Sequence, residues 1–207
     1  RYKSTTELLE VVDWHRKNNV PLDGIIQDWQ YWGSNYLWNS MDFLSETYAR
    51  GPQMIDHVHR QNAHIMISIW ASFGPWTDQY KELKEIKALI PFETWPRRRG
   101  VAPYDPFNPE ARNIYWKYLK HLYDMGIDAW WTDSTEPDRF DMTERHFSLP
   151  TADGTFRSVH NAFPLMANKG IYENQRAISN DKRLYLMTRS SSFGQQRYGS
   201  FCWSGDV

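Results

Sequence analysis

The chain has 207 residues, of which 41% are hydrophobic and 16% aromatic, a composition that can bury a core and that excludes disordered and fibrous proteins. Its formal net charge of −1 gives no strong field for gathering nucleic acid or an anionic membrane surface, so a neutral partner fits best. The eleven Trp and twelve Tyr suit sugar stacking or an aromatic core equally well. The single cysteine, Cys202, excludes an internal disulfide.

The sequence shows no signal peptide, lipidation motif or apolar run of membrane length. We therefore expect a soluble protein without a membrane-spanning segment or a nucleic-acid partner. Its compartment, cytoplasmic or exported, stays open, because the chain begins inside a pattern at Arg1 and an export signal can lie upstream. The oligomeric state stays open as well.

Helical and strand patterns alternate along the chain. Apolar spacing behind a capping box at Ser4–Glu7 predicts the first helix, and Asn108-Pro109-Glu110 opens the third. In chain order, the predicted helices are residues 5–18, 52–61, 109–122 and 162–179. The predicted strands are residues 24–29, 63–70, 127–131, 184–189 and 201–205.

This helix-then-strand order predicts parallel strands joined by helical crossovers. A doubly wound sheet would call for a Gly-rich phosphate loop, and the sequence contains none. We therefore predict an α/β fold of the (β/α)8 TIM-barrel type. A whole barrel has eight strands and about 250 residues, so residues 1–207 should form only part of one, about strands two to six, with no second domain.

Three predicted strands are followed by long loops, roughly residues 30–50, 71–107 and 134–161, and loops of this length are usually functional. Polar or aromatic side chains also recur where the predicted strands end, at Asp28, Trp70, Asp133 with Glu136, Arg189 and Asp206. In a β/α barrel these ends surround the active site. Two carboxylates facing one cleft are what cleavage of a glycosidic bond requires.

Each of these residues also has an ordinary structural interpretation. Asp133 alone suits a helix cap before Pro137, and Asp206 alone suits a turn. The repetition at successive strand ends favours a site instead. A metal site is weakly supported, because His57 and His59 lie two apart on a predicted helix and point to different faces. The basic run 97–99 is typical of a solvated or structural segment.

Three segments resemble those of glycoside hydrolase family 31. Trp131-Thr132-Asp133-Ser134-Thr135-Glu136 resembles its W-x-D-x-x-E nucleophile segment, Arg189-Ser190-Ser191 its arginine segment, and Trp203-Ser204-Gly205-Asp206 its W-x-G-D acid/base segment. The strands ending in Asp28-Trp29 and in Trp70 resemble its second- and third-strand substrate-contact segments. The resemblance covers nearly the whole chain and implies a retaining, exo-acting α-glycosidase that needs no cofactor or metal.

The resemblance also implies residue roles. Asp133 would be the nucleophile and Asp206 the general acid/base. The substrate-binding side chains would be Asp28, Trp29, Trp70, Trp131, Glu136, Arg189 and Trp203.

The resemblance implies that substrate choice depends on the residue just after the second strand, where α-glucosidases of this family tend to place an Asp and α-xylosidases an aromatic residue. An aromatic residue there, Trp29, would favour α-xylosides, whereas Asp28 in that place would favour α-glucosides. The string Gln-Asp-Trp-Gln-Tyr-Trp at residues 27–32 is similar to α-xylosidase members, although some of these carry a Lys where this chain has Trp131. We therefore expect an oligosaccharide partner of the xyloglucan type with terminal α-linked xylose, and otherwise terminal glucose for an α-glucosidase or α-transglucosylase.

Two function classes outside this family are also compatible with the residues. One is a noncatalytic carbohydrate-binding barrel, and the other is a metal-dependent sugar isomerase on a similar barrel. The family's opening strand and its late-strand histidine have no counterpart in the sequence, so we expect these 207 residues to be inactive by themselves.

Overall fold

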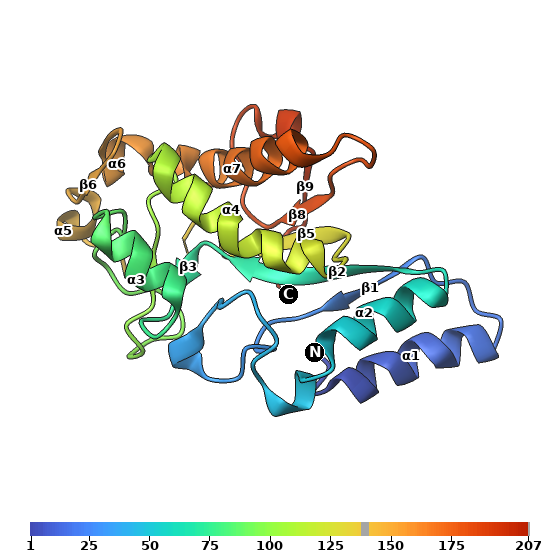
Figure 1. The fold of residues 1–207 in the computed structure, drawn as a ribbon. Helices are drawn as coiled ribbons and strands as arrows, with labels where there is room; N and C mark the ends of the chain where they lie inside the picture. Colours follow the sequence, from blue (N-terminus) through green and yellow to red (C-terminus); the bar gives the residue numbers. More distant parts are fainter. Residues whose placement is uncertain (138–140, 207) are drawn as a thin grey trace.

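The computed structural model describes residues 1–137 and 141–206. Its centre is a parallel sheet of five strands whose spatial order follows the chain: β1 (Gly24–Gln27), β2 (His64–Trp70), β5 (Ala129–Asp133), β8 (Leu186–Thr188) and β9 (Ser200–Cys202). An order that never reverses is that of a barrel, whereas a doubly wound sheet reverses at its switch point. The prediction of a partial (β/α)8 barrel is confirmed (Figure 1).

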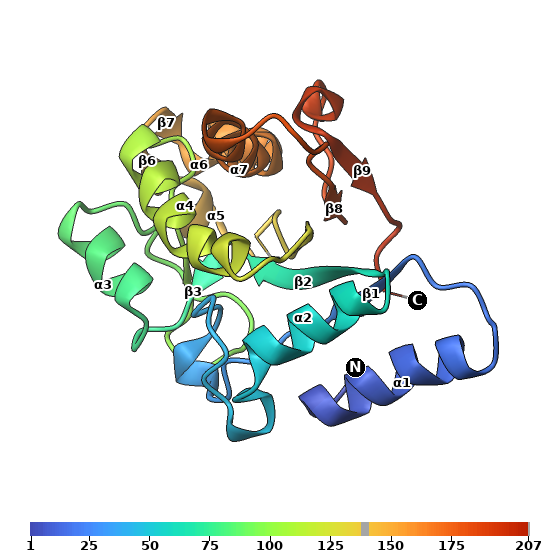
Figure 2. The ribbon, with the colours of Figure 1, turned by 45° about the vertical axis from the view of Figure 1, so that its right-hand side comes forward.

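The four predicted crossover helices are present, with ends within two residues of the predicted ones: α1 (Thr5–Lys17), α2 (Gly51–Arg60), α4 (Pro109–Asp124) and α7 (Phe163–Ile178). α1 begins at Ser4, whose Oγ accepts the Glu7 N–H at 3.1 Å. The Oδ1 of Asn108 caps α4 in the same way. Figures 1 and 2 show α1 beside α2 and α4 beside α7.

One strand lies two residues further along the chain than predicted. We predicted residues 127–131, but β5 is Ala129–Asp133, so Asp133 is the last residue of the strand instead of following it. The shift arises because the Asp128 carboxylate and N–H both bond the backbone of Ile65, at 2.9 and 3.0 Å, which sets the start of pairing. The other four strands match their predicted ranges within three residues.

The segments predicted as long loops contain further short elements. α3 (Asp78–Glu85) was missed because it is almost entirely polar, with only Gln79 and Leu83 buried, and so lacks an apolar period. The other elements in the loops are η1 (Asn35–Leu37), η2 (Glu46–Tyr48), β3 (Ser72–Phe73), β4 (Ala102–Pro103), α5 (Glu144–Phe147), β6 (Pro150–Thr151), β7 (Gly154–Thr155), α6 (Phe156–Val159), η3 (His160–Ala162) and η4 (Gln195–Tyr198).

The two faces of the sheet differ, because side chains alternate across a strand. Ile65, Ile67 and Ile69 of β2 are fully buried on one face. The other face is open near the amino ends of the strands, where Ile26 and Tyr185 are 38% and 49% exposed and line a hollow of about 730 Å³. Among the described residues, β1 and β9 form the two outer edges of the sheet, as expected for part of a barrel.

Asp128 joins three elements below the amino ends of the strands. Its Oδ2 accepts the Ile65 N–H at 2.9 Å and lies 2.8 Å from His59 Nε2 of α2, while Oδ1 lies 3.4 Å from His64 Nδ1. Burial acts to raise the pKa of Asp128, but the hydrogen bonds from Ile65 and His59 outweigh it and hold the pKa below its usual value. The carboxylate is therefore a stabilising contact between α2, β2 and β5.

We predict that Asp128→Asn lowers the free energy of unfolding by about 1–3 kcal/mol at pH 7. Because the folded pKa lies below the unfolded value of about 3.9, the stabilisation is present above that value and is lost as pH falls through the folded pKa. Urea denaturation of the protein and the variant at pH 7, 5 and 3 should give a difference that is constant above pH 5 and shrinks below about pH 4. Asp124→Asn, at an exposed ion pair with Lys120, is the matched control. A difference independent of pH would contradict this account.

Candidate active site

β5 ends abruptly at Asp133. Register pairs Asp133 with Trp70, the last residue of β2, so both side chains leave the sheet at one level. Ser134 then takes a left-handed conformation, φ 49°, and its N–H donates to Asp133 Oδ1 at 2.8 Å. The Thr135 hydroxyl closes the turn by donating to the Thr132 carbonyl at 2.9 Å. In the described part of the chain, Asp133 thus bonds its own turn and caps no helix.

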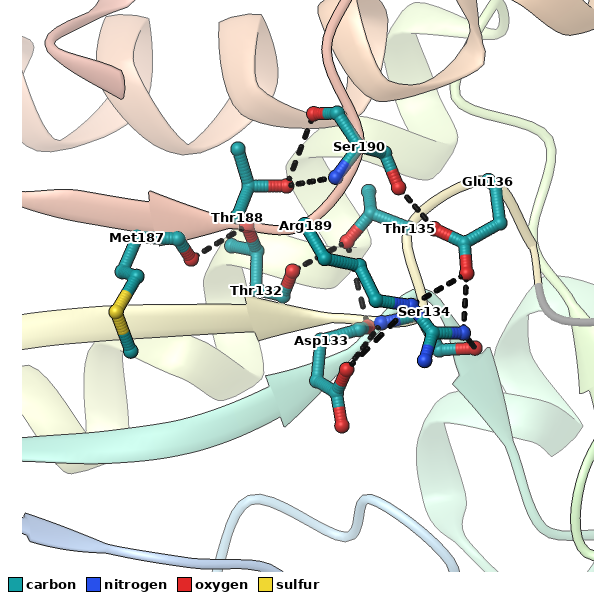
Figure 3. Close-up of polar contacts among 9 residues, drawn as sticks. All are labelled: Thr132, Asp133, Ser134, Thr135, Glu136, Met187, Thr188, Arg189 and Ser190. Carbon is teal, nitrogen blue, oxygen red and sulfur yellow. Dashed lines mark hydrogen bonds and ion pairs between the residues drawn. The ribbon is translucent and has the colours of Figure 1, made fainter. Parts of the chain in front are cut away.

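Arg189 follows β8 and lies between two carboxylates (Figure 3). Its Nε is 3.8 Å from Asp133 Oδ1 and donates to Glu136 Oε1 at 2.7 Å. A second guanidinium nitrogen also donates to Glu136 and, at 3.3 Å, to the Ser134 hydroxyl. The Ser190 hydroxyl donates to the other oxygen of Glu136. Glu136 therefore orients the arginine and holds its Nε near Asp133.

The Asp133 carboxylate is buried, with 8% of the residue exposed. Burial raises the pKa of Asp133 to about 7, because desolvation disfavours the charged form. The Arg189 cation and the Ser134 N–H oppose this rise, whereas the carboxylates of Glu136 and Asp206 add to it. Asp133 thus titrates near neutral pH, as functional carboxyl groups often do.

Asp28 and Asp206 belong to the same electrostatic cluster. Asp28 follows β1, is half-buried, and accepts the Trp29 N–H at 2.7 Å. Burial raises the pKa of Asp28, the Trp29 hydrogen bond opposes the rise, and repulsion from Asp206 adds to it. Asp206 itself is exposed, four residues beyond β9. Because Asp206 raises the pKa of both Asp28 and Asp133, the three carboxyl groups share one region at the carboxyl ends of the strands.

Aromatic side chains form a wall from β1 to β2. The ring of Trp29 lies 5.3 Å from that of Trp38, and the ring of Trp38 lies 4.7 Å from that of Trp70. Trp29 is half-buried, whereas Trp38 and Trp70 are buried. Trp29 therefore packs on the wall, while Asp28 belongs to the carboxylate cluster.

A second aromatic pair lies on the other side of Asp133. Trp131 contacts Trp203 edge to face, with ring centroids 5.5 Å apart. Within the described residues, the indole N–H groups of Trp131 and Trp70 are buried without a hydrogen-bond partner. Buried donors are normally satisfied, so these two N–H groups are exceptions to the usual pattern.

Two residues that the sequence analysis did not single out hold Trp70 in place. The Asn39 side chain, fully buried, donates to the Trp70 carbonyl at 2.6 Å and accepts its N–H at 3.1 Å. The Tyr115 hydroxyl donates to the same carbonyl at 2.9 Å. Asn39 has φ 58°, a conformation that Asn tolerates better than most residues. In the sequence, Asn39 is visible only as an Asn inside an aromatic-rich loop. That pattern does not predict its hydrogen bonds to the backbone of Trp70.

A polar hollow of about 400 Å³ adjoins Arg189. Its lining combines side chains from the loop after β5, the start of α7 and the loops after β8 and β9, among them Glu136, His160, Asn161, Ser190 and Ser204. His160 and Asn161 lie in a segment that we predicted only as part of a long loop. The hollow provides room for a polar ligand beside the guanidinium.

The histidines considered as metal ligands, together with His64, contact carboxylates away from this site. His57 Nε2 lies 2.7 Å from Asp13 Oδ1 and joins α2 to α1, while His59 and His64 both contact Asp128. Among residues 1–137 and 141–206, no group of three or more His, Cys, Asp or Glu side chains has a metal-binding arrangement. Over the same residues, no helix is long and apolar enough to cross a membrane.

The chain is similar in sequence to known proteins over all or nearly all of its length. It is 39% identical to an α-xylosidase of Saccharolobus solfataricus over 100% of this chain and 27% of that protein. An α-xylosidase of Emericella nidulans is 29% identical over 94% of this chain and 25% of its own length. The chain thus spans about a quarter of the length of these relatives.

Solved structures show the same similarity over nearly the whole chain. The crystal structure of the family 31 α-xylosidase of Xanthomonas citri superposes with a TM-score of 0.91 at 35% identity, covering 100% of this chain and 24% of that one. A dextranase of Flavobacterium johnsoniae, at 23% identity and a TM-score of 0.88, shares the fold over 99% of this chain and 26% of its own. The sequence model of the glycosyl hydrolases family 31 TIM-barrel domain matches residues 1–207. The chain belongs to this family of TIM-barrel domains.

Proposed function

We propose that this domain carries the catalytic centre of a retaining α-glycoside hydrolase that releases terminal α-linked xylose from xyloglucan-type oligosaccharides. The observation that carries the proposal is the buried Asp133 carboxylate, which faces an arginine at 3.8 Å and belongs to the same cluster as Asp206. Trp70 and Trp131 beside it suit a sugar ligand, because flat indole rings stack on the C–H faces of sugars. The similarity to α-xylosidases over the whole chain supports the substrate class.

In the first step, the Asp133 carboxylate attacks the anomeric carbon while Asp206 donates its proton to the departing glycosidic oxygen. The bond from the anomeric carbon to that oxygen breaks as the bond to Asp133 forms, and the aglycone leaves with the proton. In the second step, Asp206 removes a proton from water, whose oxygen attacks the anomeric carbon and releases Asp133. Two inversions restore the original configuration, and no cofactor takes part.

The exposures of the two carboxyl groups fit these different roles. Asp133 must be ionised to attack, and the Arg189 cation favours its charged form against the cost of burial. Asp206 is exposed, so a leaving group and then a water molecule can reach it. We propose that Arg189, while oriented by Glu136, also donates to sugar hydroxyls.

The aromatic wall supports xylose over glucose. Trp29, Trp38 and Trp70 present ring surface instead of polar groups beside the site, and xylose lacks the hydroxymethyl group that a glucosidase must accommodate. Asp28 is the residue that supports the alternative, an α-glucosidase or α-transglucosylase, since a carboxylate can bond the outer hydroxyls of glucose. An α-glucosidase of Bacillus thermoamyloliquefaciens is 24% identical over 99% of this chain.

We predict that the full-length protein hydrolyses 4-nitrophenyl α-xyloside with kcat/KM at least about tenfold above that for the α-glucoside. Asp133→Ala and Asp206→Ala should each reduce α-xyloside turnover by a factor on the order of 10³ or more, because each removes a group that reacts. Asp78→Ala, at an exposed ion pair with Lys81 on α3, is the matched control and should retain activity. Full activity of either site variant would contradict the mechanism, and a preference for the α-glucoside would contradict the substrate assignment.

The dependence of kcat/KM on pH should reflect the ionisation of Asp133. The nucleophile must be ionised, so the acidic limb of the kcat/KM profile should rise with pH through the pKa of Asp133, about 7. Arg189→Ala removes the cation that stabilises the carboxylate and should move this limb to higher pH by about one to three units, while Arg189→Lys should move it less. Arg157→Ala, at an ion pair with Glu144, is the control. If Arg189→Ala leaves the acidic limb of the kcat/KM profile at the same pH, this role for Arg189 is contradicted.

A further inference from the structure

Three loops beyond the sheet meet around two exposed tryptophans. Residues 34–38 follow β1, residues 74–77 follow β3, and residues 93–100 precede β4. Figure 1 shows β3 and α3 beyond the arrowhead of β2, at the same end of the sheet as the candidate active site. Trp76 is 58% exposed and Trp95 is 48% exposed, although indole rings are costly to leave in water.

Trp76 is held in a fixed orientation despite its exposure. Its ring stacks on Tyr36, with centroids 4.4 Å apart and planes 20° apart, and the backbone N–H of Trp76 donates to the backbone carbonyl of Tyr36 at 3.1 Å. A Cβ on Gly74 would lie 2.3 Å from that carbonyl, so the close approach of these two loops requires glycine. The stack is therefore built into the backbone.

Arg99 completes the arrangement. Its guanidinium lies over the Tyr36 ring at 5.2 Å and donates to the Tyr36 hydroxyl at 3.1 Å. The Glu93 carboxylate fixes the loop by accepting the N–H groups of Arg99 and Gly100 at 2.7 and 2.8 Å. The guanidinium of Arg99 has five N–H donors, and the hydrogen bond to the Tyr36 hydroxyl uses one of them. The guanidinium therefore places further polar donors at the edge of the Tyr36 ring.

The backbone joins the stack to the aromatic wall of the candidate active site. Trp38, which contacts Trp70, lies two residues after Tyr36, and its carbonyl accepts the Gly74 N–H at 3.0 Å. Trp70 is in turn the register partner of Asp133. One run of chain thus links the wall beside Asp133 to the exposed face of Trp76.

We propose that Trp76, stacked on a Tyr36 ring that also contacts Arg99, is a sugar-binding platform for a pyranose ring of the substrate that lies beyond the cleaved bond. A flat, rigid indole face suits the C–H surface of a pyranose, and neighbouring N–H donors suit its hydroxyls. The near-neutral chain favours this uncharged occupant over a charged one. The proposal rests on the proposed function, because the rest of the oligosaccharide is what extends from the site.

The test compares a substrate that reaches the platform with one that does not. In the full-length enzyme, Trp76→Ala should raise KM for a xyloglucan oligosaccharide about tenfold with little change in kcat, and should leave hydrolysis of α-xylosyl fluoride, which has no sugar aglycone, unchanged. Trp76→Phe keeps a ring and should recover part of the loss. Trp14→Ala removes an equally exposed tryptophan on α1 and should change neither substrate.

Binding separates this proposal from the proposed function. Titration of the oligosaccharide into Asp133→Ala and into Asp133→Ala/Trp76→Ala should give about tenfold weaker affinity for the double variant. A wild-type enzyme that hydrolyses neither substrate overturns the proposed function, and the titration still decides the platform. Equal affinity in the two variants, or an equal loss on both substrates in Trp76→Ala, overturns the platform.

Discussion

A single cation shared between two carboxylates sets the chemistry of this domain. Arg189 donates to Glu136 and faces Asp133 at 3.8 Å, so the group that orients the arginine differs from the group that the arginine stabilises. Without the cation, Asp133 would be a buried carboxylate near two others, and its charged form would be strongly disfavoured. The anchor on Glu136 is thus what makes an ionised Asp133 compatible with burial.

The parallel sheet brings these groups together from distant parts of the sequence. Register sets Trp70 beside Asp133, and the left-handed Ser134 turns the chain immediately after the strand so that the next residues fold back toward β8. Arg189 leaves the neighbouring strand at the same level. The strand order brings these side chains close together, and the short turns after the strands orient them. A barrel scaffold carries a site on its loops in this way.

The fold and the positions of the site residues could be predicted from the sequence, because strand ends are visible as apolar runs that stop on polar groups. The contacts within the site could not. Glu136 is predicted to bind substrate, but local patterns gave no sign that its carboxylate contacts Arg189 and Ser190. Asn39 gives no periodic signal, and α3 was missed because its exposed helix lacks an apolar stripe. Long-range polar partners depend on three-dimensional proximity, which local patterns do not encode.

The proposed mechanism requires Asp133 to form a covalent bond to the sugar. The most direct measurement is incubation of the full-length protein with 5-fluoro-α-xylosyl fluoride, followed by proteolysis and mass spectrometry of the labelled peptide. The account predicts a single 5-fluoroxylosyl ester on Asp133. A label on any other residue, or release of inverted product without a covalent intermediate, would contradict it.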